Sequence, residues 1–458
     1  MPWIEWRGRS CRVRWDTGRV DPETGKPIYD SKSSMDWTED EAYNYGLDRE
    51  SDIRNDRYIS RRDGSVLMRD YCRTWPETLE VGHLRDKAIR SMLRLYIVPR
   101  WGETAVGDIK PSAYRTWKKQ LKALPSVGEK YGEEILTVFS MLMDDAVDDE
   151  LRQSSPVPKG KKRRRGKYRK KPREKKREMR MEDVHQLALN ALTFWGLPGY
   201  VFVLTMSFTG MRPAELYALR REFCHPAWPD ADPDAERRVE SLGRYAGERR
   251  MPVIRVQWQH QREEGEPKLF PPKYESYRDL VIPPFLAELL ELLLASSQDE
   301  WVFRSVNGSL LVNANFTYHY WRPIADGRLA SGVFERVRLG QRQTVVSRRP
   351  LPEIPATAYA GKRLYLLRHG HKEWLDEDGH SRIAVETRMG HEIAGVEGLY
   401  ANVTTAMEQR IMDTLQQRWL RFVRSVGPDM AAASPISLPS DLRDWVKAQV
   451  KAAEGLGR

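Results

Sequence analysis

The chain has few cysteines and no long hydrophobic run. Only Cys11, Cys72 and Cys224 occur in 458 residues; they are widely spaced, and their number is odd. This pattern argues against a disulfide framework or a paired-cysteine zinc site and favours a reducing compartment. No apolar stretch approaches the roughly 18 to 20 residues that a membrane span needs, and the opening MPWIEWRGRS lacks the apolar centre of a signal peptide. We therefore expect a cytoplasmic protein without membrane contact.

Basic residues are concentrated in one segment. The whole chain has a formal net charge of +11, whereas residues 159–180 hold 15 Lys and Arg against two Glu, a local charge of +13 that leaves about −2 elsewhere. Such a run repels itself and cannot pack as a core, which favours an extended linker that releases counterions when it lies on phosphates. A solvated linker without a specific contact is the alternative. The candidate DNA-binding residues are Lys161, Lys162, Arg163, Arg164, Arg165, Lys167, Arg169, Lys170 and Lys171.

The length of the chain suggests two to four domains. Residues 1–62 are expected to form a small module with a half-buried strand, because Cys11, Val13 and Trp15 alternate with arginines in RSCRVRWD. A capping box at 38–41, Thr-Glu-Asp-Glu, is expected to open a short helix. A small sheet with arginines on one face suits DNA binding, and a purely structural role is the alternative.

Residues 65–155 are predicted to form a helical domain. Apolar residues recur every four positions over 84–96, and Pro99 is expected to end that helix. Two further helices are predicted over 113–121 and 135–147. The basic linker over 156–180 follows.

Residues 181–425 are predicted to form a larger mixed domain, followed by a tail over 426–458. Helices are expected over Glu182–Leu192, Tyr200–Phe208 and Phe285–Ala295, and MPVIRVQWQ and SYRDLVIPP are expected to be strands. The inserts at 225–250 and 335–360 have no clear periodicity and are expected to be surface loops. The predicted fold class is mainly α with small β-sheets: a helical domain, then a mixed α+β domain.

Two arginines are candidates for binding a phosphate. Arg212 precedes Pro213, a favoured first helical residue, so its side chain is expected near a helix N-terminus, where free amides also attract an anion. Arg368 ends the apolar LYLLR and is expected at a buried helix start. Two planar guanidiniums can bracket one phosphate and stabilise its transition state. The alternatives are a plain helix-start arginine or a Glu215 partner for Arg212, and a structural salt bridge for Arg368.

Three further residues suit covalent attack on a phosphodiester. Lys273, in the loop PPKYESYRD, can donate a proton to a leaving oxygen, with Lys268 and Arg278 as nearby alternatives. His391 follows Arg368 by 23 positions and can contact a phosphate or assist proton transfer, and Tyr400, nine further on, is the candidate nucleophile. The flanking glycines, at 395 and 398, are expected to make the segment of Tyr400 flexible enough to present the phenol.

Four histidines near these residues could in principle suggest a metal site. Their spacings match no helical metal pair, and acidic ligands are not suitably placed, so we expect no metal. The four are His369, His371, His380 and His391.

The stretches YLLRHGHKEWL and GHEIAGVEGLY, together with TGMRP, resemble the tyrosine recombinase (phage integrase) family, and in particular integrases of actinobacterial phages and integrative elements. The motifs cover about 181–415, and the helical domain before them resembles the family's core-binding domain, so the resemblance spans roughly three quarters of the chain. One position departs from the family. Its members usually have histidine three residues before the second arginine, where this chain has Tyr365, a poorer base near neutral pH.

The resemblance implies a mechanism. Tyr400 would attack the scissile phosphate, giving a 3′-phosphotyrosine and a free 5′-hydroxyl, and a partner strand would reverse the step through a Holliday junction. The expected catalytic residues are Arg212, Lys273, Tyr365, Arg368, His391 and Tyr400. Neither ATP nor a metal would be required, so no cofactor is expected.

The resemblance also implies partners. They are double-stranded DNA attachment sites, three further copies of the chain in a tetramer on DNA, and a recombination directionality factor, at the bacterial nucleoid. The module at 1–62 would then bind arm-type DNA sites, and the reaction would integrate or excise a mobile element such as a viral genome.

Two other functions share these residues. One is a type IB topoisomerase, which uses the same tyrosine chemistry, and the other is a catalytically silent DNA-binding regulator, which Tyr365 favours. After Tyr400, an amphipathic helix is predicted whose apolar face would dock on a neighbouring protomer, with packing on its own domain as the alternative. That face consists of Ile411, Leu415, Trp419 and Phe422.

Overall fold

The computed structural model describes most of the chain in two compact units, Met1–Pro172 and Arg173–Arg458. The candidate DNA-binding residues of the basic segment and the candidate nucleophile Tyr400 lie outside the described residues. Among the residues that are described, no helix is both long and apolar enough to cross a membrane. The described residues are 1–22, 24–55, 58–60, 64–158, 178–225, 251–263, 265–338, 341–392, 403–432 and 434–455.

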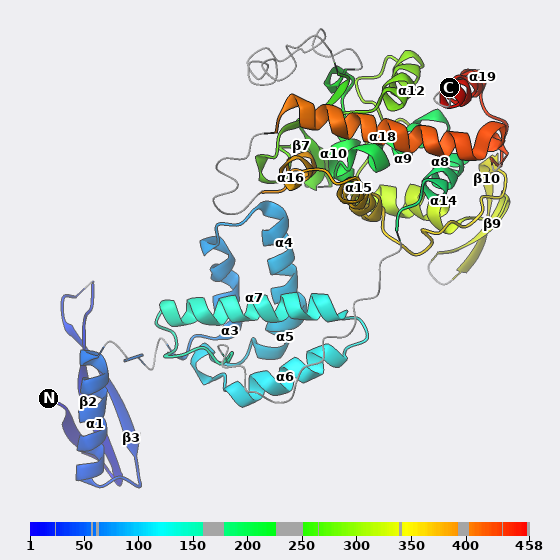
Figure 1. The fold of residues 1–458 in the computed structure, drawn as a ribbon. Helices are drawn as coiled ribbons and strands as arrows, with labels where there is room; N and C mark the ends of the chain where they lie inside the picture. The colour runs from blue at the N-terminus through cyan, green and yellow to red at the C-terminus, as the bar shows by residue number, and fades with distance from the viewer. Residues whose placement is uncertain are drawn as a thin grey trace, which may run out of the picture. The chain divides into compact units, whose positions relative to one another are not determined.

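The first unit begins with a three-stranded antiparallel sheet of order β1-β2-β3 that packs on one helix (Figure 1). The apolar face of β2 is buried, with Cys11 and Val13 fully inaccessible and Trp15 3% exposed, so the predicted alternation is confirmed. The predicted capping box is also present, because Thr38 caps the helix and accepts from the backbone N–H of Glu41. The elements are β1 (Trp3–Arg7), β2 (Ser10–Val20), β3 (Pro27–Ser34) and α1 (Glu39–Arg54).

The rest of the first unit is helical, as predicted. Trp101, Trp117 and Phe139 pack against one another at its centre, with ring centroids 5.0 to 5.9 Å apart. The elements are α3 (Met68–Thr74), η1 (Trp75–Thr78), α4 (His83–Met92), η2 (Leu93–Ile97), α5 (Val98–Trp101), η3 (Val106–Asp108), α6 (Pro111–Ala123) and α7 (Glu129–Asp148).

Two details of the first predicted helix are wrong. Pro99 does not end it: a π-helical turn, η2, intervenes and Pro99 lies in the first turn of α5. The wider turn, in which the Val98 N–H donates to the Leu93 carbonyl, accommodates the proline ring that a regular helix would reject. The buried face also differs, because Leu84 is 48% exposed while Ile89 and Ile97 are fully buried.

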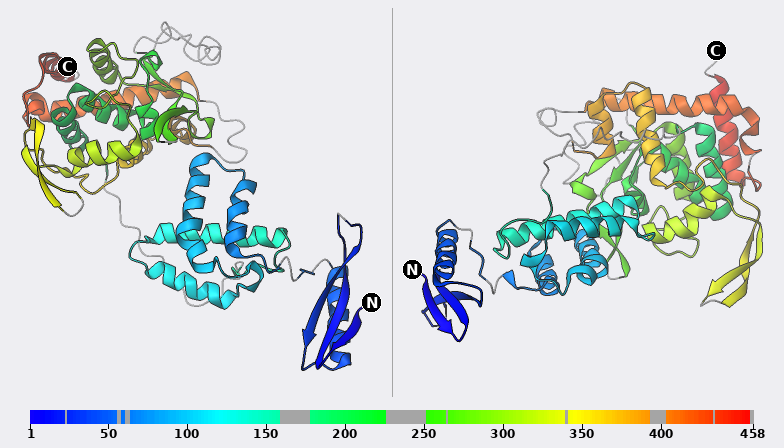
Figure 2. Two further views of the ribbon diagram at one scale, coloured as in Figure 1. Left: turned by 180° about the vertical axis from the view of Figure 1, so that it is seen from behind. Right: turned by 90° about the horizontal axis from the view of Figure 1, so that it is seen from below.

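The second unit is mixed, with helices around small sheets (Figures 1 and 2). One sheet has the order β4-β5-β8, and two hairpins are separate from it. The strands are β4 (Cys224–His225), β5 (Val253–Val256), β6 (Gln259–Glu263), β7 (Glu266–Phe270), β8 (Arg278–Val281), β9 (Ser331–Arg338) and β10 (Gln341–Leu351). The helices are α8 (Met181–Trp195), α9 (Leu197–Thr209), α10 (Pro213–Tyr217), η4 (Arg221–Phe223), η5 (Lys273–Glu275), α12 (Pro284–Ala295), α13 (Asn313–Phe316), η6 (Thr317–Trp321), α14 (Arg322–Asp326), α15 (Tyr365–Glu377), α16 (Arg382–Met389), α18 (Thr405–Val426), η7 (Gly427–Ala431) and α19 (Ser440–Gly455).

The inserts turn out differently from each other. Most of the insert at 335–360 belongs to the β9/β10 hairpin and not to the predicted irregular loop. The strands were not predicted because arginines and glutamines interrupt the alternation of apolar and polar residues that is typical of a strand. The other insert, from 226 to 250, lies outside the described residues.

The C-terminal helices belong to the core of the second unit. The face of α18 that was predicted to dock on a neighbouring protomer is buried against its own unit, with Leu415 and Trp419 inaccessible, so that prediction is wrong. Trp419 stacks on Phe285 of α12 at 4.3 Å and lies 5.7 Å from Trp445 of α19. Part of the predicted tail over 426–458 is therefore a packed helix: α19 covers α18.

Candidate active site

Arg212 lies where the chain passes from α9 to α10. Helix α9 ends at Gly210, whose φ of 64° is in the left-handed region, and Arg212 then serves as the N-cap before Pro213. A side chain at Gly210 is excluded, because a Cβ there would lie 2.6 Å from Cδ2 of His371. The predicted Glu215 partner is real: the Arg212 backbone N–H and Nη1 donate to the two carboxylate oxygens at 2.8 and 2.7 Å.

The side chain of Arg212 also contacts the end of α16 and the turn before β8. Its Nη2 donates to the Gly390 carbonyl at 2.7 Å, and its Nη1 donates to Ser276 Oγ at 3.1 Å. Arg212 therefore connects three segments that are distant in sequence: the start of α10, the turn before β8 and the end of α16.

Arg368, in the first turn of α15, is 1% exposed. Its Nη1 donates to the Gly210 carbonyl at 2.6 Å, and its Nη2 contacts both the Met389 carbonyl and Nε2 of His391, the latter at 3.0 Å. All these partners are neutral acceptors, so the contacts do not support the alternative of a structural salt bridge. Burial and the nearby charge of Arg212 lower the pKa of Arg368 to about 10, which leaves it protonated at neutral pH.

His391 is placed by the end of α16. Gly390 ends this helix at φ 62°, and the His391 N–H donates to the Glu386 carbonyl at 3.0 Å, as in a Schellman motif. This turn brings the two side chains together, with Nδ1 of His391 2.6 Å from Oε2 of Glu386. Burial and the charge of Arg368 lower the pKa of His391, against an opposing contribution from Glu386.

Arg278 contacts the turn at the end of α16 and also binds Glu215. Its Nη1 and Nη2 donate to the two oxygens of Glu215 at 3.2 and 2.7 Å, and its Nε donates to the Arg388 carbonyl at 2.9 Å. A Cβ on Gly390 would lie 2.9 Å from Arg278 Nη1, so a side chain at this position would displace Arg278. Arg278 was considered as a proton donor, but its buried contacts indicate an anchoring role.

Positive charge exceeds negative charge in this cluster. Glu215 is the carboxylate shared by Arg212 and Arg278, and its side chain is fully buried. Burial alone would raise the pKa of Glu215, but Arg278 and Arg212 outweigh it and the net pKa is lowered, so the group is ionised. Arg212, Arg278 and Arg368 outnumber Glu215, and the second carboxylate of the site, Glu386, is matched by Lys372, so the excess positive charge favours the binding of an anion.

The structure does not place Lys273 and Tyr365 as close to the turn at the end of α16 as it places the two arginines and His391. Lys273 is exposed in η5, three residues before Ser276, and its Nζ lies 4.8 Å from the Tyr274 ring centroid. Tyr365 begins α15 and is 39% exposed, and its ring centroid lies 5.9 Å from the Arg368 guanidinium carbon. The other candidate lysine, Lys268, pairs with Glu263 at 2.6 Å. The last candidate catalytic residue, Tyr400, is among the undescribed residues.

His371 and Arg388 form a buried hydrogen-bonded pair next to the site, which was not predicted from the sequence. His371 is fully buried, with Nδ1 3.0 Å from the Ser207 carbonyl and Nε2 accepting from Arg388 Nε at 3.1 Å. Arg388 also donates to the carbonyls of Val281 and Phe208 at 2.8 and 3.0 Å. The pair ties α15 and α16 to α9 and β8. Burial and the Arg388 charge hold the pKa of His371 well below its usual value.

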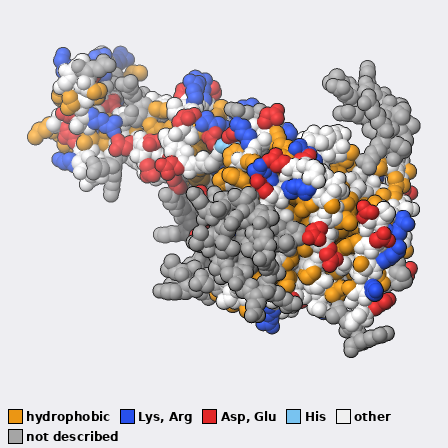
Figure 3. All heavy atoms as spheres, turned by 90° about the horizontal axis from the view of Figure 1, so that it is seen from above, with side chains coloured by type: hydrophobic (Ala, Val, Ile, Leu, Met, Phe, Trp, Pro, Cys, Tyr) orange, Lys and Arg blue, Asp and Glu red, His pale blue; other side chains and the backbone are white. Residues whose placement is uncertain are grey.

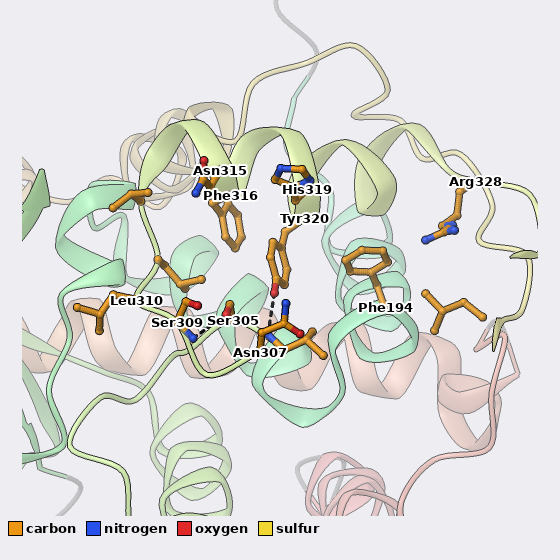
Figure 4. A pocket seen from close by; sticks show the side chains of 14 residues that line it. Phe194, Ser305, Asn307, Ser309, Leu310, Asn315, Phe316, His319, Tyr320 and Arg328 are labelled. Carbon is orange, nitrogen blue, oxygen red and sulfur yellow. Dashed lines mark hydrogen bonds between the residues drawn. The ribbon is translucent and has the colours of Figure 1, made fainter. Parts of the chain in front are cut away.

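A cavity of about 440 Å³ elsewhere in the second unit is a different feature (Figure 4). Phe194, Phe316 and Tyr320 line it, and the Tyr320 hydroxyl accepts from the Val306 N–H at 2.7 Å. The residues that line it do not include the arginines or histidine of the candidate site.

Comparison with protein-family models gives no match, and neither does comparison with curated proteins. Among solved structures, the Tn1549 transposon integrase in complex with transposon right end DNA is similar over 75% of this chain and 97% of that chain, at 14% identity and a TM-score of 0.46. A lambda integrase tetramer bound to a Holliday junction is similar over 86% and 98%, at 11% identity and a TM-score of 0.44. XerA recombinase is similar over 77% and 96%, at 12% identity and a TM-score of 0.28.

Proposed function

We propose that this protein is a site-specific DNA recombinase of the tyrosine recombinase class, with Tyr400 as its nucleophile. The observation that carries the proposal is the convergence of Arg212, Arg368 and His391 on the turn that ends α16. Two guanidiniums directed at one place, with an imidazole beside them, suit the non-bridging oxygens of a phosphodiester.

The chemistry follows from these groups. The arginines stabilise the negative charge that develops at phosphorus as Tyr400 attacks. The phenol proton goes to a base, the new bond joins the tyrosine oxygen to the 3′-phosphate, and the bond from phosphorus to the 5′-oxygen breaks. Lys273 donates a proton to that leaving oxygen. A 5′-hydroxyl from a second duplex reverses the step and rejoins the strands.

The proposal extends to the organisation of the protein on DNA. Residues 181–425 form the catalytic domain, 65–155 bind the core of the attachment site, 1–62 bind arm sites, and the basic segment at 156–180 lies along the duplex. On the face drawn in Figure 3, basic and acidic side chains are interspersed over the described surface. The sequence places the most concentrated positive charge, +13, in residues 159–180. Four copies exchange strands through a Holliday junction, with a directionality factor deciding between integration and excision.

Trapping of the covalent intermediate tests the proposal. The substrate is a nicked duplex that carries the junction between the encoding element and its host chromosome. We expect a protein–DNA adduct that survives denaturation and disappears in Tyr400→Phe, while the control Tyr318→Phe, an exposed tyrosine in η6, retains it. An adduct that persists in Tyr400→Phe would contradict the proposed nucleophile.

Two further outcomes separate the alternatives. Relaxation of a supercoiled plasmid that lacks the junction would favour a topoisomerase. Specific binding of the junction without any adduct would favour a silent regulator.

A further inference from the structure

The side chains around His391 determine which of its nitrogens carries a proton. Arginine has only donors, so Nε2 of His391, 3.0 Å from Arg368 Nη2, must be the acceptor in that contact. An ionised carboxylate has only acceptors, so Nδ1, 2.6 Å from Glu386 Oε2, must be the donor. Both contacts are satisfied together only by a neutral imidazole with its proton on Nδ1.

Glu386 is itself held in its ionised form. Its other oxygen, Oε1, pairs with the Lys372 ammonium from α15, and its side chain is 17% exposed. Burial would raise the pKa of Glu386, but Lys372 and His391 lower it, with a net lowering. Glu386 and Lys372 are not among the site residues predicted from the sequence.

We propose that Glu386 is a positioning residue that fixes His391 in the Nδ1-protonated form, so that Nε2 receives the phenol proton of Tyr400, and that Lys372 in turn orients Glu386. This inference rests on the proposed function. The role of the imidazole that Tyr365 replaces is then taken by Glu386 of α16 together with His391, which follows that helix. When a phosphate enters, Arg368 bonds it and Nε2 becomes free for the proton, which returns to the phenol as the strands rejoin.

The charges around His391 determine in which direction its pKa should change when a neighbour is removed. The negative charge of Glu386 favours the imidazolium, whereas the positive charges of Arg368 and Lys372 disfavour it. Removal of Glu386 must therefore lower the pKa of His391, and removal of Lys372 must raise it. Among the described residues, the charged groups that face His391 or its turn are Arg368 and Lys372 from α15, Glu386 from α16, Arg212 beside α10 and Arg278 from β8.

Nitrogen-15 NMR of the full chain tests the tautomer without any DNA. The signal of His391 is identified among the nine histidines by its loss in His391→Gln. We expect a neutral ring protonated on Nδ1, a lower His391 pKa in Glu386→Gln and a higher one in Lys372→Met. Asp376→Asn, which makes the same carboxyl-to-amide change at an exposed position of α15, is the matched control and should leave the pKa unchanged. A proton on Nε2, or a Glu386→Gln variant that titrates like the control, would overturn the inference.

The pH dependence of cleavage tests the role. A base must be unprotonated, so cleavage of the nicked junction duplex should fall in acid as His391 protonates. In Glu386→Gln this decline should move to lower pH and the plateau rate should drop by about tenfold or more, because a weaker base accepts the proton. In Lys372→Met the decline should move to higher pH.

The two tests fail independently. Cleavage that depends on Tyr400 but declines at the same pH in all variants would refute the inference and leave the proposed function intact. A confirmed tautomer without any Tyr400-dependent adduct would refute the proposed function, and with it the role of the pair in cleavage.

Discussion

Removal of Arg278 should destabilise the second unit in a pH-dependent way. In Arg278→Met, the buried Glu215 loses two hydrogen bonds, at 2.7 and 3.2 Å, and keeps only Arg212 as a charged partner. The carbonyls of Arg388 and Ser276 also lose a donor. Breaking a buried ion pair from one side costs about 3 to 5 kcal/mol, and we expect a loss in that range at neutral pH.

The sign of the pH dependence follows from Glu215. Its folded pKa lies below its unfolded pKa, so its ion pairs stabilise the fold above the unfolded pKa, and this contribution is lost as the pH falls through the folded pKa. The wild-type chain and Arg278→Met should therefore differ most at neutral pH and approach each other in acid.

The assay has to isolate the second unit, because a chain of two units need not unfold in one step. Hydrogen exchange in urea, followed in peptides from β8 and α10, reports on this region directly. Arg262→Met, at an exposed position of β6, is the matched control and should change the stability by less than about 0.5 kcal/mol.

A double variant tests whether the ion pair between Arg278 and Glu215 causes the loss of stability. Arg278→Met combined with Glu215→Gln should be more stable than the sum of the two single changes by about 2 kcal/mol, since the second change removes the uncompensated charge. Additive losses, or an Arg278→Met loss that is the same at neutral and acid pH, would show that the ion pair does not anchor the turn.

Three other predictions are simpler. Gly390→Ala should cost about 1 to 2 kcal/mol of backbone strain and also weaken junction cleavage by displacing Arg278, whereas Gly379→Ala, at φ 70° in open space, should show only the strain in the same urea assay. Trp445→Ala should lower the free energy of unfolding of the second unit by about 3 kcal/mol, measured as for Arg278, because Trp445 covers Trp419. Replacing the nine basic residues within 161–171 by serine should weaken DNA binding and flatten its dependence on salt concentration in an anisotropy titration, and an unchanged slope would exclude phosphate contacts there.

Local patterns in the sequence were enough for several elements. The burial of Cys11 and Val13 and the cap at Thr38 depend on neighbours in the chain, so a period of two and a four-residue motif sufficed. Arg212 and Arg368 were expected to act together because their residue types suit one phosphate, and the structure brings them to the same turn. Their catalytic roles, and those of Lys273 and Tyr400, remain predictions.

Features that depend on distant contacts were missed. The apolar face of α18 has the same pattern whether it packs on its own unit or on another copy, and the positions of Phe285 and Trp445 in the folded unit decide between them. The buried contacts of Arg278, which the sequence suggested only as an alternative proton donor, and of Arg388 could not be predicted, since their carboxylate and carbonyl partners lie far along the chain. The contact between Glu386 and His391 could have been predicted from the sequence. A glycine that ends a helix, here Gly390, places the next residue beside the one five positions before it.

Arg368 is held mainly by backbone carbonyls, at Gly210 and Met389, whereas Arg212 adds the Gly390 carbonyl to the side chains of Glu215 and Ser276. A carbonyl is supplied by any amino acid, so the position of Arg368 depends on where two helices end more than on which side chains surround it. Related chains can therefore diverge in sequence around Arg368 and keep its geometry, provided that the two glycines remain. Random mutagenesis with selection for recombination should find Gly210 and Gly390 among the least replaceable positions of the second unit.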